Sequence, residues 1–303
     1  MRTVGQYLVM TGMFLAVPLL ALLMVPGIPS GYRGLSNQND PAGPVMYIVL
    51  ILVMTGVFLV LIKRSKMGLL KTLLFAAMGL GLFSIGSLFA MMAGQSEVPS
   101  LATGALLATS FIVILLKHPR WYVINGAGLV LGVGAAFVLG ISLGVLSSLI
   151  LLTLLAVYDA ISVYVTKHML TLAEGVGDLG LPIVLVVPGR AGEEVKKLDL
   201  HDRSKDAERE MMLMGLGDAI IPSVLVVSAA ANLSPVSAIG WSSPALTVAV
   251  LTLASVLLGF LSLMFLISKG RPQAGLPFLN GSAIIGYATA YLLVYQDLGF
   301  GFA

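Results

Sequence analysis

Residues 151–166 read LLTLLAVYDAISVYVT, and residues 211–227 read MMLMGLGDAIIPSVLVV. Each stretch belongs to an apolar run of membrane-spanning length and holds one acidic residue, Asp159 in the first and Asp218 in the second. Every other Asp and Glu falls in a connection or at the end of an apolar run. A carboxyl group inside the hydrocarbon core is costly, so such groups mark functional sites. The two aspartates are therefore the first candidates for an active site.

The two aspartates are predicted to lie at similar depth in the membrane. Asp159 is eight residues from Lys167, and Asp218 is nine residues from Arg209. With a helical rise of about 1.5 Å per residue, both would lie roughly 12–14 Å from the same membrane face. We therefore expect the two carboxyl groups to meet within the bilayer.

The composition of the 303-residue chain indicates a multi-pass membrane protein. Hydrophobic residues make up 58% and charged residues only 10% of it, whereas soluble domains carry about 25% charged residues. The net charge of +3 is a topology signal and does not indicate a nucleic-acid partner. There is no cysteine and no HExxH motif, and the three histidines lie in polar connections. These features exclude thiolate sites, the usual intramembrane zinc site and a buried serine–histidine pair.

Nine apolar runs approach or exceed the length needed to cross a bilayer, about 20 residues. We therefore predict an all-α polytopic membrane protein with nine transmembrane helices. The first run is longer than the apolar core of a signal peptide and no clear cleavage site follows it, so we expect it to be retained. The predicted spans are residues 6–26, 45–62, 69–92, 99–116, 121–139, 141–166, 211–231, 244–267 and 277–295.

The distribution of positive charge predicts the orientation of these spans. With nine spans, 16 of the 17 Lys and Arg residues fall on one side of the membrane and only Arg33 on the other. The N-terminus is then cytoplasmic and the C-terminus outside, with both aspartates nearer the cytoplasmic face. We predict three parts: an N-terminal six-helix bundle (1–166), a polar cytoplasmic connection (167–210) and a C-terminal three-helix part (211–303).

The polar connection contains one apolar run. Residues 181–187 read LPIVLVV and lie between Gly180 and Pro188. The run is too short to span a membrane and is rich in β-branched residues, which favours a strand or a membrane-apposed segment. The second half of the connection, residues 190–210, is mixed in charge and is typical of a solvated linker.

Two carboxyl groups held close together can hydrolyse a peptide bond without a covalent enzyme intermediate. One carboxylate acts as the base toward a water molecule, and the other carboxyl, protonated, polarises the scissile carbonyl. Because two adjacent carboxyls do not both ionise readily, they share a proton and titrate as a pair. This chemistry predicts an aspartyl protease that needs no cofactor. The residues do not assign which aspartate is the base.

The neighbours of the two aspartates fit such a site. The glycines on either side of Leu216 allow a neighbour or a substrate to approach the backbone before Asp218 closely. Pro222 loosens the helix and frees backbone polar groups. Tyr158 adjoins the other aspartate but points about 100° away from it around a helix. Its hydroxyl is therefore predicted to serve substrate binding or packing.

These motifs resemble those of presenilin and signal peptide peptidase, the GxGD intramembrane aspartyl proteases. Tyr158-Asp159 in the sixth predicted span is similar to the YD motif, and Gly215-Leu216-Gly217-Asp218 in the seventh is similar to GxGD. The long polar connection between them matches as well. The resemblance implies that Asp159 and Asp218 are the catalytic pair. The predicted cytoplasmic N-terminus resembles the orientation of presenilin. We expect the protein to be a microbial or archaeal presenilin homologue in the cell membrane.

The third motif of the family, Pro-Ala-Leu at the start of the ninth span, is altered here. Pro277-Phe278-Leu279 stands at that place, with phenylalanine instead of alanine. A literal Pro-Ala-Leu at residues 244–246 opens the eighth span on the opposite side of the membrane, far from the aspartates. We therefore assign the role to Pro277, Phe278 and Leu279, which the resemblance implies line the site and hold the substrate.

The resemblance implies substrates that are transmembrane helices of other proteins in the bilayer, with their N-termini outside. Such a helix must unwind before its peptide bonds are accessible. We predict that the apolar run of the connection pairs with the unwound substrate as an added strand, and that Pro277–Leu279 is a candidate second edge. The predicted pairing residues are Pro182, Ile183, Val184, Leu185, Val186 and Val187.

Other function classes remain open at this point. Paired intramembrane acids also carry protons or cations in transporters and channels, although no inverted repeat or polar stripe through several spans supports that function. Prepilin peptidases also use GxGD, but they have fewer spans and lack the YD motif. An inactive structural membrane protein is a further alternative. The sequence is compatible with oligomerisation.

Overall fold

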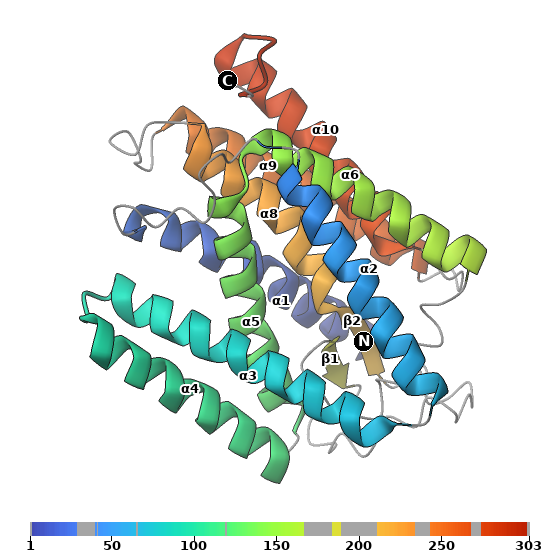
Figure 1. The fold of residues 1–303 in the computed structure, drawn as a ribbon. Helices are drawn as coiled ribbons and strands as arrows, with labels where there is room; N and C mark the ends of the chain where they lie inside the picture. The colour runs from blue at the N-terminus through green and yellow to red at the C-terminus, as the bar shows by residue number, and fades with distance from the viewer. Residues whose placement is uncertain are drawn as a thin grey trace. The chain divides into compact units, whose positions relative to one another are not determined.

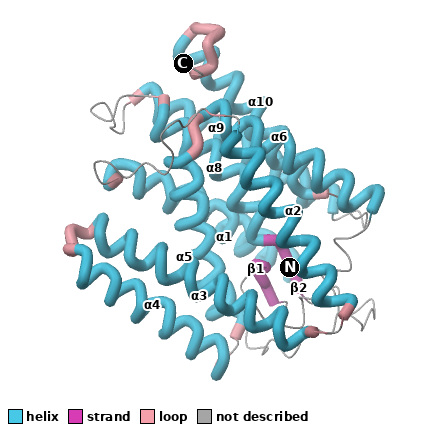
Figure 2. The backbone as a smooth tube through the Cα atoms, viewed as in Figure 1, coloured by secondary structure: helices cyan, strands magenta, loops and turns pink. Residues whose placement is uncertain are grey.

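The computed structural model describes residues 2–28, 40, 42–64, 66–118, 120–166, 184–188, 211–233, 243–267 and 274–301. In these ranges the chain forms nine α-helices and one two-stranded antiparallel sheet (Figures 1 and 2). The helices are α1 (Arg2–Met24), α2 (Ala42–Lys63), α3 (Met67–Met92), α4 (Glu97–Lys117), α5 (Trp121–Ser142), α6 (Val145–Ile161), α8 (Leu216–Asn232), α9 (Pro244–Ile267) and α10 (Gly275–Tyr295). The strands are β1 (Val184–Pro188) and β2 (Met211–Gly215); a 3₁₀ turn η1 (Val25–Gly27) follows α1, and a π-helical turn η2 (Ser162–Thr166) follows α6.

Eight helices in the described residues are long and apolar enough to cross a membrane, by length and composition. They correspond to all of the predicted spans except the seventh, so the prediction of an all-α multi-span protein is confirmed. Large apolar side chains are exposed along these helices, for example Leu50 of α2 and Leu258 of α9. Such exposure is the expected pattern for helices whose outer faces contact lipid.

The predicted seventh span, residues 211–231, is wrong in its first five residues. Met211–Gly215 form β2, and α8 begins only at Leu216 and contains 17 residues. The Met-rich segment has no β-branched residue, so its own residues do not favour a strand. Its pairing with β1 overrides this local preference. The depth calculated for Asp218 therefore does not hold, because a strand rises about 3.3 Å per residue instead of the helical 1.5 Å.

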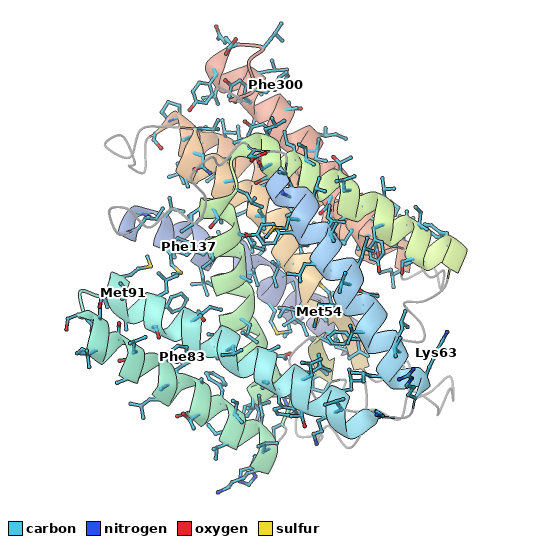
Figure 3. All side chains as sticks on the ribbon, viewed as in Figure 1. Met54, Lys63, Phe83, Met91, Phe137 and Phe300 are labelled. Carbon is cyan, nitrogen blue, oxygen red and sulfur yellow. The ribbon has the colours of Figure 1, made fainter. Side chains whose placement is uncertain are left out.

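The chain forms two compact units. The first comprises Met1–Ala16, Thr55–Gly134 and Leu170–Gly217. Within it, α3 and α4 lie side by side (Figure 1), and Leu82, Leu115 and Ile124 are buried in a shared core. Phe83 of α3, labelled in Figure 3, packs against this core. This unit also holds the sheet.

A buried asparagine fixes β1 to α5 in the first unit. The Asn125 side chain donates from Nδ2 to the carbonyl oxygen of Val186 over 2.7 Å, and its Oδ1 accepts from the Val186 N–H over 2.8 Å. The amide thus takes the place of a neighbouring strand at one edge of β1. Because both backbone groups of Val186 point to Asn125, that edge is closed at its centre.

The second unit comprises Val17–Met54, Ala135–Met169 and Asp218–Ala303. Within it α10 packs against both α9 and α6 (Figure 1). A Cβ atom at Gly259 or Gly286 would clash with a serine of the facing helix, which shows that α9 and α10 approach closely there. Next to Gly286, the Tyr287 hydroxyl donates to the carbonyl oxygen of Phe300, the residue labelled near the C-terminus in Figure 3.

Candidate active site

Asp159 lies in the last turn of α6 and is only 6% exposed. Its neighbour Tyr158 is partly exposed, so the two side chains occupy different faces of the helix, as the 100° rotation per residue requires. Immediately beyond, at Ser162, the chain changes from an α-helix to the π-helical turn η2. Such turns are frequent at functional sites.

Asp218 lies in the first turn of α8 and is partly buried. Pro222 is inside the same helix. Because proline has no N–H, the carbonyl group of Asp218, four residues earlier, receives no helical hydrogen bond from it. The loosening predicted from Pro222 therefore falls on the backbone of the aspartate itself.

The glycine before Asp218 does not serve packing within the described part of the chain. A Cβ atom placed on Gly217 would meet no atom within 4 Å there, and the residue is exposed. Contact with a described neighbour thus does not explain this glycine. Close approach of a substrate, the other interpretation of the motif, stays a prediction.

The two carboxyl groups lie next to two consecutive residues at the start of α10, Asp159 at Leu276 and Asp218 at Gly275. The N–H of Leu276 donates to Oδ2 of Asp159 over 3.1 Å. A Cβ atom on Gly275 would lie 3.3 Å from Oδ2 and 3.4 Å from Oδ1 of Asp218. The first turn of α10 therefore joins two aspartates that are 59 residues apart in the sequence.

The residues predicted to replace the Pro-Ala-Leu motif follow this contact directly. Pro277 and Phe278 are partly exposed, and Leu279 is fully buried. All three belong to α10, so the prediction that Pro277–Leu279 forms a second strand edge is wrong. Pro277 is tolerated because the first turn of a helix has no intrahelical partner for its N–H groups.

Gly275, Leu276 and Tyr164 were missed as contact residues by sequence reasoning. The Tyr164 hydroxyl accepts a hydrogen bond from the N–H of Ala274 over 3.3 Å. Gly275 and Leu276 directly precede Pro277, which marks the start of a helix. Their position at a helix N-terminus was the signal that could have identified them as contacts of a carboxyl group. Free N–H groups at a helix start attract carboxylates.

The apolar run of the connection forms a strand, as predicted. Val184, Leu185, Val186 and Val187 lie in β1, which extends to Pro188, whereas Pro182 and Ile183 lie outside the described residues. Its partner is β2, with Val186 opposite Leu213. The predicted added strand is therefore already paired on one side by the chain itself.

The register identifies the edge of this sheet that neither another strand nor Asn125 covers in the described residues, called the open edge below. Because Val186 directs its N–H and C=O to Asn125, it forms a non-hydrogen-bonded pair with Leu213 across the two strands. The N–H and C=O of Leu213 then point away from β1. Backbone groups alternate along a strand, so Met212 and Met214 pair with β1 and Leu213 faces outward.

Comparison with known proteins gives one consistent result. Residues 11–295 match the family described as signal-peptide peptidase, presenilin aspartyl protease. Two solved structures, each of a presenilin family intramembrane aspartate protease, are similar to the chain. One, in space group C222, is 32% identical over 94% of this chain and 98% of its own, with a TM-score of 0.63. The other, in space group P2, is 34% identical over 94% and 96%, with a TM-score of 0.64.

No curated protein matches the chain. The family match covers nearly its whole length, and both structural relatives exceed 30% identity. The aspartates, the strand pair and all of the helices, apart from residues 2–10 of α1, lie within the matched residues. The chain belongs to the signal-peptide peptidase and presenilin family and is an intramembrane aspartyl protease.

Proposed function

We propose that Asp159 and Asp218 are the catalytic dyad of this protease. The observation that carries the proposal is that the start of α10 meets both carboxyl groups: Leu276 donates its N–H to Asp159, and the Cβ position of Gly275 lies 3.3 Å from Oδ2 of Asp218. Three segments that are distant in the sequence thus bring the acids of the YD and GxGD motifs to the same turn. The test is cleavage of a single-span peptide by purified protein, and its loss when either aspartate becomes asparagine.

The proposed reaction is direct attack of water on a peptide bond. The ionised carboxyl takes a proton from water as the oxygen adds to the carbonyl carbon, and the protonated carboxyl gives its proton to the carbonyl oxygen. The tetrahedral intermediate then collapses as the amide nitrogen receives a proton and the C–N bond breaks. The N–H of Leu276 donates to Oδ2 of Asp159 and so fixes the orientation of that carboxyl group.

On the sequence alone, the two carboxyl groups were also compatible with a transporter or channel. The family assignment favours the protease, and no contact in the described residues supports ion transport. The proposed substrates are membrane-spanning segments of other proteins in the same bilayer. Tyr158, Gly215, Leu216, Gly217, Pro277, Phe278 and Leu279 are proposed to shape the site around them.

We propose that the unwound substrate pairs with β2. In support, Leu213 offers outward-facing backbone groups, whereas the other edge of the sheet is closed by Asn125 at Val186. An added strand gains its affinity from main-chain hydrogen bonds at such an edge. Gly215, the last residue of β2, precedes Asp218 by three residues in the chain.

Proline at Leu213 is expected to lower cleavage about tenfold, because it removes one outward N–H that an added strand would use. The pairing of β2 with β1 should persist, since the inward groups belong to Met212 and Met214. Initial rates on a single-span peptide measure the effect, with circular dichroism as the check on folding.

The matched control is proline at Met212, which removes an inward N–H from the pairing with β1. This variant is expected to lower the thermal midpoint, whereas Leu213→Pro leaves it near the wild-type value. Unchanged cleavage by a folded Leu213→Pro protein would exclude substrate pairing at this edge.

We also propose a cytoplasmic N-terminus and an outside C-terminus, with parts 1–166 and 211–303 on either side of the connection 167–210. The support is the bias of Lys and Arg toward one set of connections. In this orientation the preferred substrates have their N-termini outside.

Substrates of the two orientations are expected to differ at least about tenfold in cleavage rate, because the reversed helix presents its backbone to β2 in the wrong direction. The measurement uses one span sequence placed in both orientations by its flanking charges and reconstituted in liposomes with the protease. Equal rates for the two orientations would contradict the preference.

A further inference from the structure

We propose that Asn280 is a positioning residue for the catalytic dyad, which it serves by fixing the axial register of α10 against α6. The inference rests on the proposed role of Asp159. Asn280 is fully buried on α10, one turn after Leu276. Its Nδ2 donates to the carbonyl oxygen of Leu152 on α6 over 2.9 Å.

Three hydrogen bonds join α10 and the residue before it to α6 and the turn η2 that follows α6, in antiparallel order. Ala274 donates to Tyr164, Leu276 donates to Asp159, and Asn280 donates to Leu152. Residue numbers rise along α10 as they fall along α6, so the three bonds form one ladder. Sliding α10 along α6 would break all of them together. The apolar contacts between the helices lack this directionality, because hydrophobic packing is non-directional.

Asn280 is the member of the ladder in the interior of the helix pair. Tyr164 is 54% exposed, and the bond from Leu276 ends on the catalytic carboxyl itself. Asn280 and Leu152 are both 0% exposed. The donor of this hydrogen bond is a neutral amide, which does not take part in proton transfer. The bond can therefore hold the register of α10 unchanged while the two carboxyl groups gain and lose protons.

The register bears on both aspartates. If α10 slides, the N–H of Leu276 leaves Oδ2 of Asp159. Gly275 moves relative to the carboxyl of Asp218, whose Oδ2 lies only 3.3 Å from the position that a Cβ atom on Gly275 would occupy. Displacements of about 1 Å at a catalytic group can lower a rate about a hundredfold. Asn280 therefore acts on the chemistry through Leu276 and Gly275 without touching the substrate.

Stability does not explain this amide. Oδ1 of Asn280 is buried and has no hydrogen-bond partner in the described part of the chain. An unpartnered buried acceptor is destabilising, and leucine, of similar size, would remove that cost. Leu152 lies inside α6, so its carbonyl group keeps its own helical hydrogen bond without Asn280.

Asn232 provides a matched control in the same unit. Its Nδ2 also donates to backbone carbonyl oxygens, those of Gly140 over 3.3 Å and Leu143 over 3.0 Å. These carbonyls lie at and just beyond the end of α5, where helical donors are missing. Removal of this amide should therefore cost stability and leave the dyad in place.

The experiment compares Asn280→Leu, Asn232→Leu, Asp159→Asn and wild type for kcat, KM and thermal midpoint in one detergent. We expect Asn280→Leu to lower kcat between about tenfold and a hundredfold, with KM within about twofold of wild type and the midpoint unchanged or raised. Asn232→Leu is expected to show the reverse, a lower midpoint with kcat retained. The kcat of Asn280→Leu can be interpreted only if the variant is folded, so the thermal midpoint of this variant is measured first.

Two results would overturn the inference. One is wild-type kcat in Asn280→Leu. The other is a loss of kcat in Asn280→Leu that accompanies a fall in midpoint as large as that of Asn232→Leu, which would assign Asn280 to the fold alone. Activity in Asp159→Asn would instead remove the dyad, so the failure of the two proposals is distinguishable.

Discussion

Asparagine at Asp159 or at Asp218 is expected to abolish cleavage, with a fall in kcat of at least about 10⁴-fold for each. The amide keeps the size of the carboxyl but neither takes a proton from water nor gives one to the scissile carbonyl. At Asp159 the amide oxygen can still accept the N–H of Leu276, so the contact with α10 is retained. The loss is therefore chemical rather than structural.

The measurement is cleavage of a single-span peptide in liposomes, with products identified by mass spectrometry. Asp40→Asn is the control, because the exposed Asp40 accepts the N–H of Ala42 over 2.9 Å and asparagine can do the same. This control should cleave at the wild-type rate. A folded Asp159→Asn or Asp218→Asn protein that retains more than about a tenth of the wild-type rate would refute the dyad.

Valine at Gly275 should lower kcat about a hundredfold, the second largest effect expected here. The Cβ atom alone would lie 3.3 Å from Oδ2 of Asp218, which is tighter than most real Cβ contacts. The two γ-methyl groups extend further, so they displace the carboxyl or cover it with apolar atoms. Alanine at the same position is expected to give a smaller loss, because only the Cβ must be accommodated.

Gly281 is the control on the same helix. A Cβ atom there would meet nothing within 4 Å in the described residues, and the residue is well inside α10. Gly281→Val should therefore keep the wild-type kcat. If Gly275→Val cleaves as fast as wild type while both proteins are folded, the close contact of Gly275 with Asp218 has no role in catalysis.

The helical architecture and the presence of two aspartates inside apolar segments could be read from the sequence, because each depends on the cost of placing a local segment in lipid. A bilayer requires runs of about 20 apolar residues, and these appear directly in the chain. A carboxyl inside such a run is conspicuous for the same reason. The strand predicted within residues 181–187 was also visible, since a β-branched run between Gly180 and Pro188 is a local pattern; residues 184–187 of it lie in β1.

The partner of that strand was not predictable from the sequence. Met211–Gly215 continue an apolar run without interruption, so composition assigns them to a span. They form β2 because β1 offers a row of backbone groups, and backbone hydrogen bonding is almost independent of side-chain identity. The closure of one edge of β1 by Asn125 likewise depends on a contact with Val186, 61 positions further along the chain.

The sequence by itself determined the number and place of nearly all helices, the identity of the two aspartates and the position of the altered Pro-Ala-Leu motif. Only the tertiary structure decided that Gly275 and Leu276 contact the two carboxyls, that the open edge belongs to β2 and that Asn280 joins α10 to Leu152. The physical reason is that the two kinds of feature depend on interactions over different distances along the chain. The cost of placing a side chain in lipid depends on its own segment, whereas a hydrogen bond between helices depends on a register that no single segment encodes.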